Sequence, residues 1–471
     1  MESTGGEPIC TVDEDEGNAP PPCDETGPAD AFTPEIQWSW SPEGPHTSSV
    51  VTPLVINLTD DDMSDTIDLC DTPDIVVVTY DGEFAWPNGS DFEAGHLFVL
   101  DGETGEPHWE YETLIDHTLT PAVGDMDGDG LPEIVTATRT ELLIINHDGS
   151  TLFQKPLPST LAQQAIALAD LDNNGQVEIV CRQYIYDHEA NLIRTLPRGN
   201  ATAIPVDLDG DGDLEIVEGF SAWHHDGEMI FNHPAGITFM TFTAVADLDD
   251  DGLPEIVGVG DDGIYIFEEN GDVKINGGNS DRSPPAIVDI DADGTPEIAL
   301  VSQGNAYRVL DVALSAYWSS PVDDGSGAAS GTAFDFLGDG SAETMYADET
   351  DLFLFDQDGL VELSSPRTSW TQTEYPVVAD VDNDGSAEIV VVSNIGYGGV
   401  ASPTVQVLRD IDDRWVPARR IWNQHAYHVT NVLEDGRIPQ YEQPHYQSFN
   451  TFRVNTQIGT DGAGDCIPPV D

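Results

Sequence analysis

Four acidic side chains at a fixed spacing are the residues of this chain best suited to chemistry. In the first clear copy they are Asp125, Asp127, Asp129 and Glu133, at positions 1, 3, 5 and 9 of a short loop. Carboxylates this close repel one another unless a cation lies among them, and Ca²⁺ accepts about six to eight oxygen ligands. We therefore predict a Ca²⁺ site, to which the main-chain carbonyl of Leu131 at position 7 adds a further oxygen.

The residues around these carboxylates indicate the kind of loop. Gly130 at position 6 permits the positive φ that lets the backbone fold around an ion. An EF-hand loop has about twelve residues and lies between two helices. Here nine residues precede the β-branched pair Ile134-Val135, so we expect the loop to run directly into a strand.

The pattern returns six more times, with starts 37 to 46 residues apart, a range typical of repeat architectures. Asp and Gly also form ordinary turns, but seven copies in one register favour metal binding. The copy at Asp170 has the neutral ligand Asn174 at position 5, and the copy at Asp335 has Leu337 at position 3, so that site is weak or empty. The predicted ligands of the other copies are Asp170, Asp172, Asn174, Gln176 and Glu178; Asp207, Asp209, Asp211, Asp213 and Glu215; Asp247, Asp249, Asp251, Leu253 and Glu255; Asp289, Asp291, Asp293, Thr295 and Glu297; and Asp380, Asp382, Asp384, Ser386 and Glu388.

An eighth, distorted copy begins at Asn57 and ends at Asp74, with an insertion between. Its candidate ligands are Asn57, Thr59, Asp61 and Asp74. The insertion adds further carboxylates, so the ligand set stays open: Asp65, Asp68 and Asp71.

These loops resemble the FG-GAP/VCBS repeats of integrin-α-like β-propellers, whose blades carry Asp-x-Asp-x-Asp-Gly-x-x-Asp/Glu calcium loops. The resemblance covers roughly residues 46–410. It implies an all-β propeller with about six to eight structural Ca²⁺ ions, one for each well-formed loop. It also implies that the loops connect the first two strands of each blade, away from the usual ligand-binding face.

Each repeat unit contains four predicted strands, which is one propeller blade. In the second unit they are Pro121–Gly124, Ile134–Thr138, Leu142–Asn146 and Thr151–Lys155. Eight units predict eight antiparallel blades, with seven as the alternative if the first unit is partial. The segment Glu35–Trp40 alternates like a strand, and we expect it to pair with the last blade and close the ring, which removes exposed sheet edges.

The chain divides into three parts: an acidic, Pro-rich N-terminal arm with the closing strand (1–45), the propeller (46–410) and a C-terminal extension (411–471). We expect the extension to brace the propeller. Two alternatives stay open for it. Arg419 and Arg420 could bind an anionic partner, and His425 and His428 could bind a metal.

The composition is strongly acidic, with a formal net charge of −73. The seven clear loops hold 28 of the 88 acidic residues, so seven divalent ions would neutralise only part of the charge. A polyanion is repelled by nucleic acid and anionic lipid. We expect partners to be a protein or glycan on a cell surface or matrix, or further copies of the chain.

We expect an extracellular or cell-surface location, with a signal peptide removed, because cytosolic Ca²⁺ is too scarce for low-affinity sites. There is no apolar run long enough to cross a membrane, so we expect no membrane insertion. Among the five cysteines, we expect a disulfide between Cys10 and Cys23 and a buried thiol at Cys181. Cys70 lies in the insertion, and the pairing of Cys466 stays open.

No nucleophile elbow or phosphate loop accompanies the acidic loops. We therefore expect no catalysis and a calcium-stabilised structural, adhesive or assembly protein. One alternative is a lectin-like propeller that stacks sugars on loop aromatics such as Trp86 and Tyr397, although the loop around Trp86 could equally cap the propeller edge. The other is a polysaccharide lyase, which needs a cationic groove that only Arg414, Arg419 and Arg420 could supply.

Overall fold

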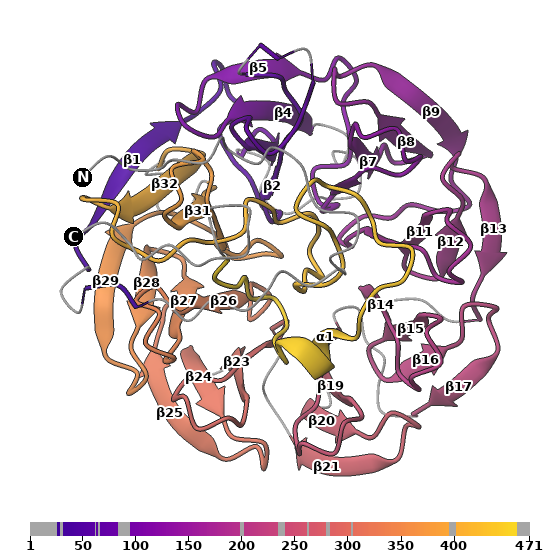
Figure 1. Ribbon diagram of the computed structural model, residues 1–471, viewed down its shortest axis with the longest axis vertical. Coiled ribbons are helices and arrows are strands. Elements are labelled where there is room, and N and C mark those ends of the chain that lie inside the picture. Colours follow the sequence, from indigo (N-terminus) through magenta and orange to yellow (C-terminus); the bar gives the residue numbers. More distant parts are fainter. Residues whose placement is uncertain are drawn as a thin grey trace, which may run out of the picture.

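The computed structural model describes residues 26–28, 32–61, 63–64, 66–82, 95–197, 202–233, 241–260, 263–278, 283–302, 305–394 and 402–458. These residues form eight four-stranded antiparallel sheets, arranged as blades around a central axis (Figure 1). The eight-bladed propeller predicted from the repeats is confirmed, and the distorted first unit is a complete blade.

Seven blades are built from four consecutive strands, with the first strand nearest the axis (Figure 1). Their strands are, for blade 1, β2 (Leu54–Ile56), β3 (Asp74–Thr79), β4 (His96–Asp101) and β5 (Pro107–Glu110); for blade 2, β6 (Ala122–Gly124), β7 (Glu133–Ala137), β8 (Glu141–Ile145) and β9 (Thr151–Pro156); for blade 3, β10 (Ala167–Ala169), β11 (Glu178–Cys181), β12 (Tyr184–Tyr186) and β13 (Leu192–Thr195); for blade 4, β14 (Ala203–Val206), β15 (Glu215–Glu218), β16 (Ser221–Trp223) and β17 (Met229–Asn232); for blade 5, β18 (Phe242–Ala246), β19 (Glu255–Gly260), β20 (Gly263–Phe267) and β21 (Val273–Gly278); for blade 6, β22 (Ala286–Val288), β23 (Glu297–Ser302), β24 (Ala306–Leu310) and β25 (Ala316–Pro321); and for blade 7, β26 (Gly331–Phe334), β27 (Glu343–Ala347), β28 (Asp351–Phe355) and β29 (Val361–Pro366).

Blade 8 joins the two ends of the propeller. Its three inner strands are β30 (Val377–Ala379), β31 (Glu388–Val392) and β32 (Val405–Asp410), and its outer strand is β1 (Pro34–Trp40). β1 runs antiparallel to β32, with one irregularity in register between Ile36 and Trp38. The predicted closing strand is therefore confirmed, and it removes the free edges that an open ring would leave.

The core lies between neighbouring blades. The second strand of a blade, such as β7, is buried along its whole length because adjacent blades cover both of its faces. A strand buried on both sides needs an unbroken apolar run, which explains Ile134-Val135 and its counterparts. Full burial of one such side chain contributes roughly 1.5–3 kcal/mol. The outer strands, such as β9, are largely exposed and carry polar residues.

The C-terminal segment 411–458 crosses the centre of the ring (Figure 1, yellow). It contains one short helix, α1 (His445–Ser448), and otherwise consists of turns and isolated bridges. Nothing helical in the described ranges is both long and apolar enough to cross a membrane. The segment contacts the otherwise open edges of inner strands through the backbone bridges of Trp422 to Val55 and of Phe452 to Ile287.

Candidate metal-binding loops

Backbone hydrogen bonds position the acidic side chains of the loop in blade 2. Asp125 accepts from the N–H groups of Gly128 (2.8 Å) and Gly130 (3.0 Å). Glu133 accepts through Oε2 from the N–H of Met126 (3.0 Å). Gly130 has φ of 86°, the left-handed conformation that this turn requires. The loop therefore holds the first and ninth carboxylates together at the start of the buried strand.

The same two contacts recur in all seven clear copies. The ninth-position Glu accepts from the N–H at position 2 at 2.7–3.1 Å. The first-position Asp accepts from the N–H of the sixth-position Gly at 2.6–3.2 Å. The register assigned from sequence is thus the structural register. Oxygens of three carboxylates lie within 4.8 Å of one another in the loops of neighbouring blades, for example Asp125, Asp127 and Glu133 in blade 2 and Asp170, Asp172 and Glu178 in blade 3.

Blade 1 reproduces this frame despite its insertion. Asp74 accepts through Oδ2 from the N–H of Leu58 (2.7 Å), so Asp74 takes the place of the ninth-position Glu. Thr59 donates to Asp61 and to Asp74, both at 3.2 Å. The structure therefore brings together three of the four candidate ligands, Thr59, Asp61 and Asp74. The fourth, Asn57, has its Oδ1 buried without a hydrogen-bond partner among the described residues.

Burial makes a negative charge at the ninth position unfavourable. Desolvation, opposed by the backbone hydrogen bond and reinforced by neighbouring Asp charges, raises the pKa of Glu133 to about 8. Desolvation likewise raises the pKa of Glu343 to about 8. It raises the pKa to about 7 in four further copies: Glu178, Glu215, Glu255 and Glu297. These carboxylates therefore need a bound proton or a nearby cation to be buried without a large free-energy cost.

The loop of blade 8 contains buried carboxylate oxygens that a Ca²⁺ ion could bind. Asp380 is 3% exposed and Glu388 is fully buried. Asp380 Oδ1 and Glu388 Oε1 are buried without a hydrogen-bond partner among the described residues. Desolvation raises the pKa of Asp380 to about 8 and that of Glu388 well above its ordinary value. Unsatisfied buried oxygens need a partner, and hard oxygen donors suit Ca²⁺, so the residues fit this ion.

Three other loops already contain a basic side chain. In blade 5, Lys274 Nζ lies 2.6 Å from both Asp249 Oδ2 and Glu255 Oε1. Desolvation lowers the pKa of Lys274, but these contacts raise it above its ordinary value. The other two pairs are His224 Nδ1 with Glu215 Oε1 at 2.9 Å in blade 4, and His108 Nε2 with Asp74 Oδ1 at 3.1 Å in blade 1.

In contrast, the described residues show no Lys, Arg or His side chain paired with the loop carboxylates of blades 2 and 3. Sequence reasoning missed Lys274 because it lies on β21, the outer strand of the blade, 25 residues from Asp249. The four-stranded meander carries the outer strand back beside the loop. The sequence signal for this contact is a lysine 25 residues after the third-position Asp of the same repeat, on the predicted outer strand.

The basic residues of the C-terminal segment are paired within the chain. Arg414 Nε lies 2.9 Å from Asp410, and Arg419, which is fully buried, lies 2.8 Å from Glu434. Arg420 Nε lies 3.6 Å from the same Glu434. Arg419 therefore braces the segment internally, because Glu434 belongs to the same segment. Arg420 holds the segment against the propeller, since it also donates to the carbonyl of Leu69 (2.6 Å) and to Asn383 Oδ1 (3.2 Å).

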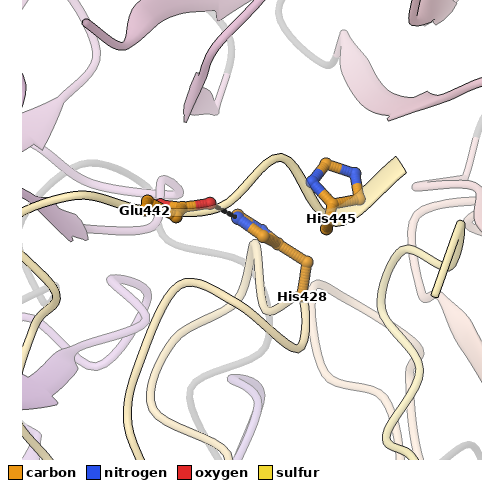
Figure 2. Close-up of side chains that lie close together, drawn as sticks. All are labelled: His428, Glu442 and His445. Atoms are coloured by element: carbon orange, nitrogen blue, oxygen red, sulfur yellow. Dashed lines mark hydrogen bonds and ion pairs between the residues drawn. The ribbon is translucent and has the colours of Figure 1, made fainter. Parts of the chain in front are cut away.

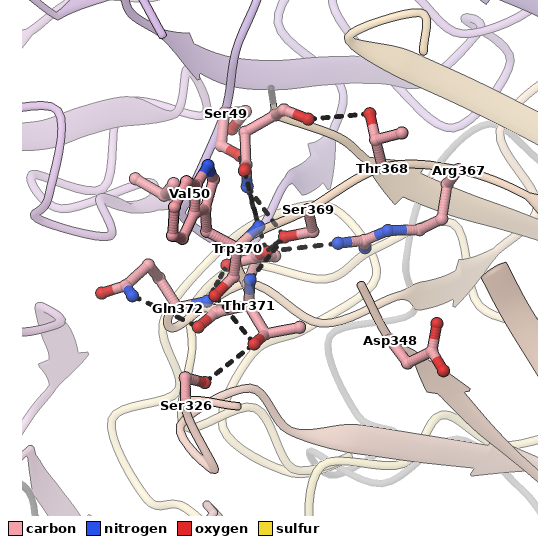
Figure 3. A network of polar contacts seen from close by, with 12 residues as sticks. Ser49, Val50, Ser326, Asp348, Arg367, Thr368, Ser369, Trp370, Thr371 and Gln372 are labelled. Carbon is pink, nitrogen blue, oxygen red and sulfur yellow. Dashed lines mark hydrogen bonds and ion pairs between the residues drawn. The ribbon is translucent and has the colours of Figure 1, made fainter. Parts of the chain in front are cut away.

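A polar network lies where blade 7 connects to blade 8, at the end of the blades opposite to the acidic loops (Figure 3). Arg367 is 2% exposed and donates to Glu374 (3.3 Å), which also accepts from the N–H of Gln372 (2.7 Å). Thr371 donates to Asp324 (2.6 Å), on the connection that precedes blade 7. Buried networks of this kind hold loops in one arrangement, so this end of the blades is braced by side chains.

Several predicted residues lie outside the described part of the chain. These are the loop aromatics Trp86 and Tyr397, the cysteines Cys10, Cys23 and Cys466, and Asp65 of the insertion. The Cys10–Cys23 disulfide therefore stays a prediction. Cys181 is a buried free thiol, and burial raises its pKa.

Comparisons with known proteins agree with this geometry. Residues 125–181 match the family model of the FG-GAP-like repeat. Among solved structures, the chain is similar to the V. cholerae biofilm matrix protein Bap1, with 20% identity over 93% of this chain and 100% of that chain and a TM-score of 0.80. It is also similar to the rhamnogalacturonan lyase YesW, with 14% identity over 83% of this chain and 75% of that chain and a TM-score of 0.52. No curated protein matches the sequence.

The fold and the loops define the class: this protein is an eight-bladed β-propeller of four-stranded antiparallel blades. More particularly, residues 125–181, which span the acidic loops of blades 2 and 3, match the FG-GAP-like repeat. At these identities the likeness to Bap1 and YesW concerns the fold alone.

Proposed function

We propose that this protein is a secreted or cell-surface structural, adhesive or assembly protein whose propeller is stabilised by about six to eight Ca²⁺ ions and which has no catalytic role. The observation that carries the proposal is the pair of buried, unpartnered carboxylate oxygens on Asp380 and Glu388. The repeated loop supplies the same kind of site around the ring.

In this role the ion supplies charge neutralisation. Asp380, Asp382, Asp384 and Glu388 would hold it in blade 8, and the corresponding residues would hold it elsewhere. A ligand that binds only the folded state adds about 2.7 kcal/mol at a hundredfold excess over its dissociation constant. Several such loops make the stability of the whole ring depend on Ca²⁺, which is abundant outside cells.

Support for a matrix or surface role comes from charge and from fold. A formal net charge of −73 disfavours nucleic acid and anionic lipid as partners. Bap1, which has the same propeller fold, is a biofilm matrix protein. A protein partner on a cell surface or matrix, or association of the chain with itself, fits both observations, whereas a selectively bound glycan would point to the lectin alternative.

The lyase alternative has less support from the site. A lyase acting on acidic sugars needs a cationic groove, and the three arginines that the alternative relies on are paired with Asp410 and Glu434. The lectin alternative relies on aromatic side chains outside the described residues. Both alternatives become outcomes of the experiment below.

The experiment compares the purified chain with and without Ca²⁺ in three assays: a glycan array, ultraviolet detection of unsaturated uronates from acidic polysaccharides, and sedimentation for self-association. We expect no unsaturated product, and adhesion or self-association that requires Ca²⁺. Steady release of unsaturated uronates would contradict the proposal in favour of the lyase. Selective binding to one glycan would replace it with the lectin.

A further inference from the structure

A group of metal-ligand side chains lies in the C-terminal segment, apart from the acidic loops. His428, Glu442 and His445 each place a ligand atom within 4.8 Å of the others (Figure 2). His428 Nε2 lies 2.6 Å from Glu442 Oε1. All three side chains are buried: those of His428 and Glu442 are 1% and 6% exposed, and His445 is fully buried.

Carbonyl groups fix which nitrogen of each ring carries a proton. His428 Nδ1 lies 3.0 Å from the carbonyl oxygen of Ala426, so Nδ1–H donates there and the Nε2 lone pair faces Glu442. His445 Nε2 lies 2.8 Å from the carbonyl oxygen of Val245, so Nε2–H donates there. The lone pair of His445 is therefore on Nδ1. Metal-binding histidines characteristically donate their other N–H to a carbonyl or carboxylate in this way.

The second observation is an unsatisfied donor atom. His445 Nδ1 is buried without a hydrogen-bond partner among the described residues. A proton shared between His428 and Glu442 would satisfy that pair but would leave His445 Nδ1 unpaired. A cation bound to both rings and to the carboxylate satisfies all three groups at once.

We propose that His428, Glu442 and His445 form a binding site for one transition-metal dication of the Zn²⁺ class. Two imidazoles and one carboxylate suit such an ion, whereas Ca²⁺ prefers oxygen ligands. Zn–N bonds are about 2.0–2.1 Å, so the ion enters by a modest separation of the Glu442 carboxylate from His428. Tyr441 is 66% exposed, so the chain reaches the surface one residue before Glu442.

The site ties together two parts of the segment that crosses the ring. His428 lies on a turn beside Tyr427, and His445 begins α1, which contacts β18 through Val245. A metal ion here would cross-link the turn to α1, and through α1 to blade 5. This metal site is separate from the acidic loops, since it shares no ligand with them.

The test uses the full chain, stripped with a chelator and returned to excess Ca²⁺ so that the acidic loops hold their ions. Co²⁺ and Zn²⁺ are then titrated. We expect one tight site per chain, visible Co²⁺ absorption bands, and X-ray absorption of the Zn²⁺ form that fits two imidazoles. Glu442→Gln and His445→Gln should each weaken binding by at least roughly tenfold, whereas the controls Glu112→Gln and His147→Gln should leave it unchanged.

The unaltered chain keeps the proposal falsifiable even if a variant fails to fold. Two imidazoles beside carboxylates also occur at His224 and His225 in blade 4 and at His46 and His96 beside Glu110, so the loss of binding in the Glu442→Gln and His445→Gln variants identifies the site. Absence of a tight site, or a Zn²⁺ spectrum with one imidazole or none, would overturn the proposal. Binding that persists unchanged in folded Glu442→Gln and His445→Gln variants would also overturn it.

Discussion

The acidic loops of blades 2 and 5 have the same backbone frame but different sources of positive charge. In both, the ninth-position Glu accepts from the N–H at position 2, at 3.0 Å in blade 2 and 2.7 Å in blade 5. In blade 5, Lys274 lies 2.6 Å from Glu255, whereas Glu133 in blade 2 has no such partner among the described residues. The negative charge of the same kind of acidic loop can therefore be neutralised either by an ion from solvent or by a basic side chain of the protein.

This difference indicates that the loops do not contribute equally to metal-dependent stability. Blade 2 needs an external cation to keep Glu133 charged in the fold. If the loops bind Ca²⁺ as proposed, blade 5 would retain Lys274 as a partner for Glu255 when metal is removed, and this ammonium would compete with Ca²⁺.

Removal of metal should have the largest effect. We expect thorough chelation to lower the melting temperature by roughly 10 °C or more, because each lost ion removes about 2.7 kcal/mol at a hundredfold excess over its dissociation constant. Scanning calorimetry in Ca²⁺ and in chelator measures this shift, and re-addition of Ca²⁺ is the control. An unchanged melt after complete chelation would show that the loops are not metal sites.

The metal-free protein should also lose stability as pH rises from about 5 to 8. Burial raises the folded-state pKa of Glu133 to about 8, above its ordinary value of 4.5, so the folded state binds more protons than the unfolded state in this window. Stability is therefore greatest at the acidic end and falls as pH approaches the folded pKa. Denaturant unfolding at several pH values checks the slope. In saturating Ca²⁺ the slope over this window should be close to zero, since the ion keeps the folded carboxylate ionised and the unfolded carboxylate is ionised above about pH 5 as well.

Matched amide substitutions should separate the two blades. In chelator near neutral pH, Glu133→Gln should stabilise the protein by about 1 kcal/mol, because a neutral amide removes the cost of protonating the buried carboxylate on folding. Glu255→Gln should destabilise it by a similar amount because it leaves Lys274 with weaker partners. In Ca²⁺ both variants should be less stable than the parent chain. Equal responses of the two variants in chelator would show that the blades do not differ.

Replacement of Lys274, the side chain that supplies positive charge in blade 5, should have the smallest effect. Lys274→Met should raise the Ca²⁺ affinity of the blade 5 loop by about threefold and lower stability in chelator, because the ammonium no longer competes for Asp249 and Glu255. Isothermal titration calorimetry measures the affinity. Lys155→Met, on the outer strand of blade 2, is the matched control and should change neither quantity. Unaltered Ca²⁺ binding in Lys274→Met would mean that the ammonium does not compete.

The architecture could be predicted from the sequence because each loop and the strand after it are specified by residues that are adjacent in the chain. The nine-residue loop and the strand after it lie within one stretch, so the register of all seven clear copies could be read directly. The eighth copy was also found, since Asn57 and Asp74 bracket the insertion. The closing strand followed from the alternation of Glu35–Trp40 and from the need to pair a free edge.

The residues that distinguish one loop from another could not be read in the same way. Lys274 reaches Glu255 only through the folding of β19, β20 and β21 into one sheet. The group around His428 shows the same limit. Sequence spacing suggested His425 as its partner, but the turn and α1 bring Glu442 and His445 to it instead. Contacts between segments distant in sequence depend on how strands pair within a blade and on how the C-terminal segment crosses the ring. Neither can be read from a local sequence pattern.

The most direct measurement of the central claim is the number of Ca²⁺ ions bound by the folded chain, obtained by equilibrium dialysis and elemental analysis. We expect about six to eight ions per chain, with one fewer in Glu133→Gln. Binding of no Ca²⁺ by a fully folded chain at millimolar concentration would contradict it.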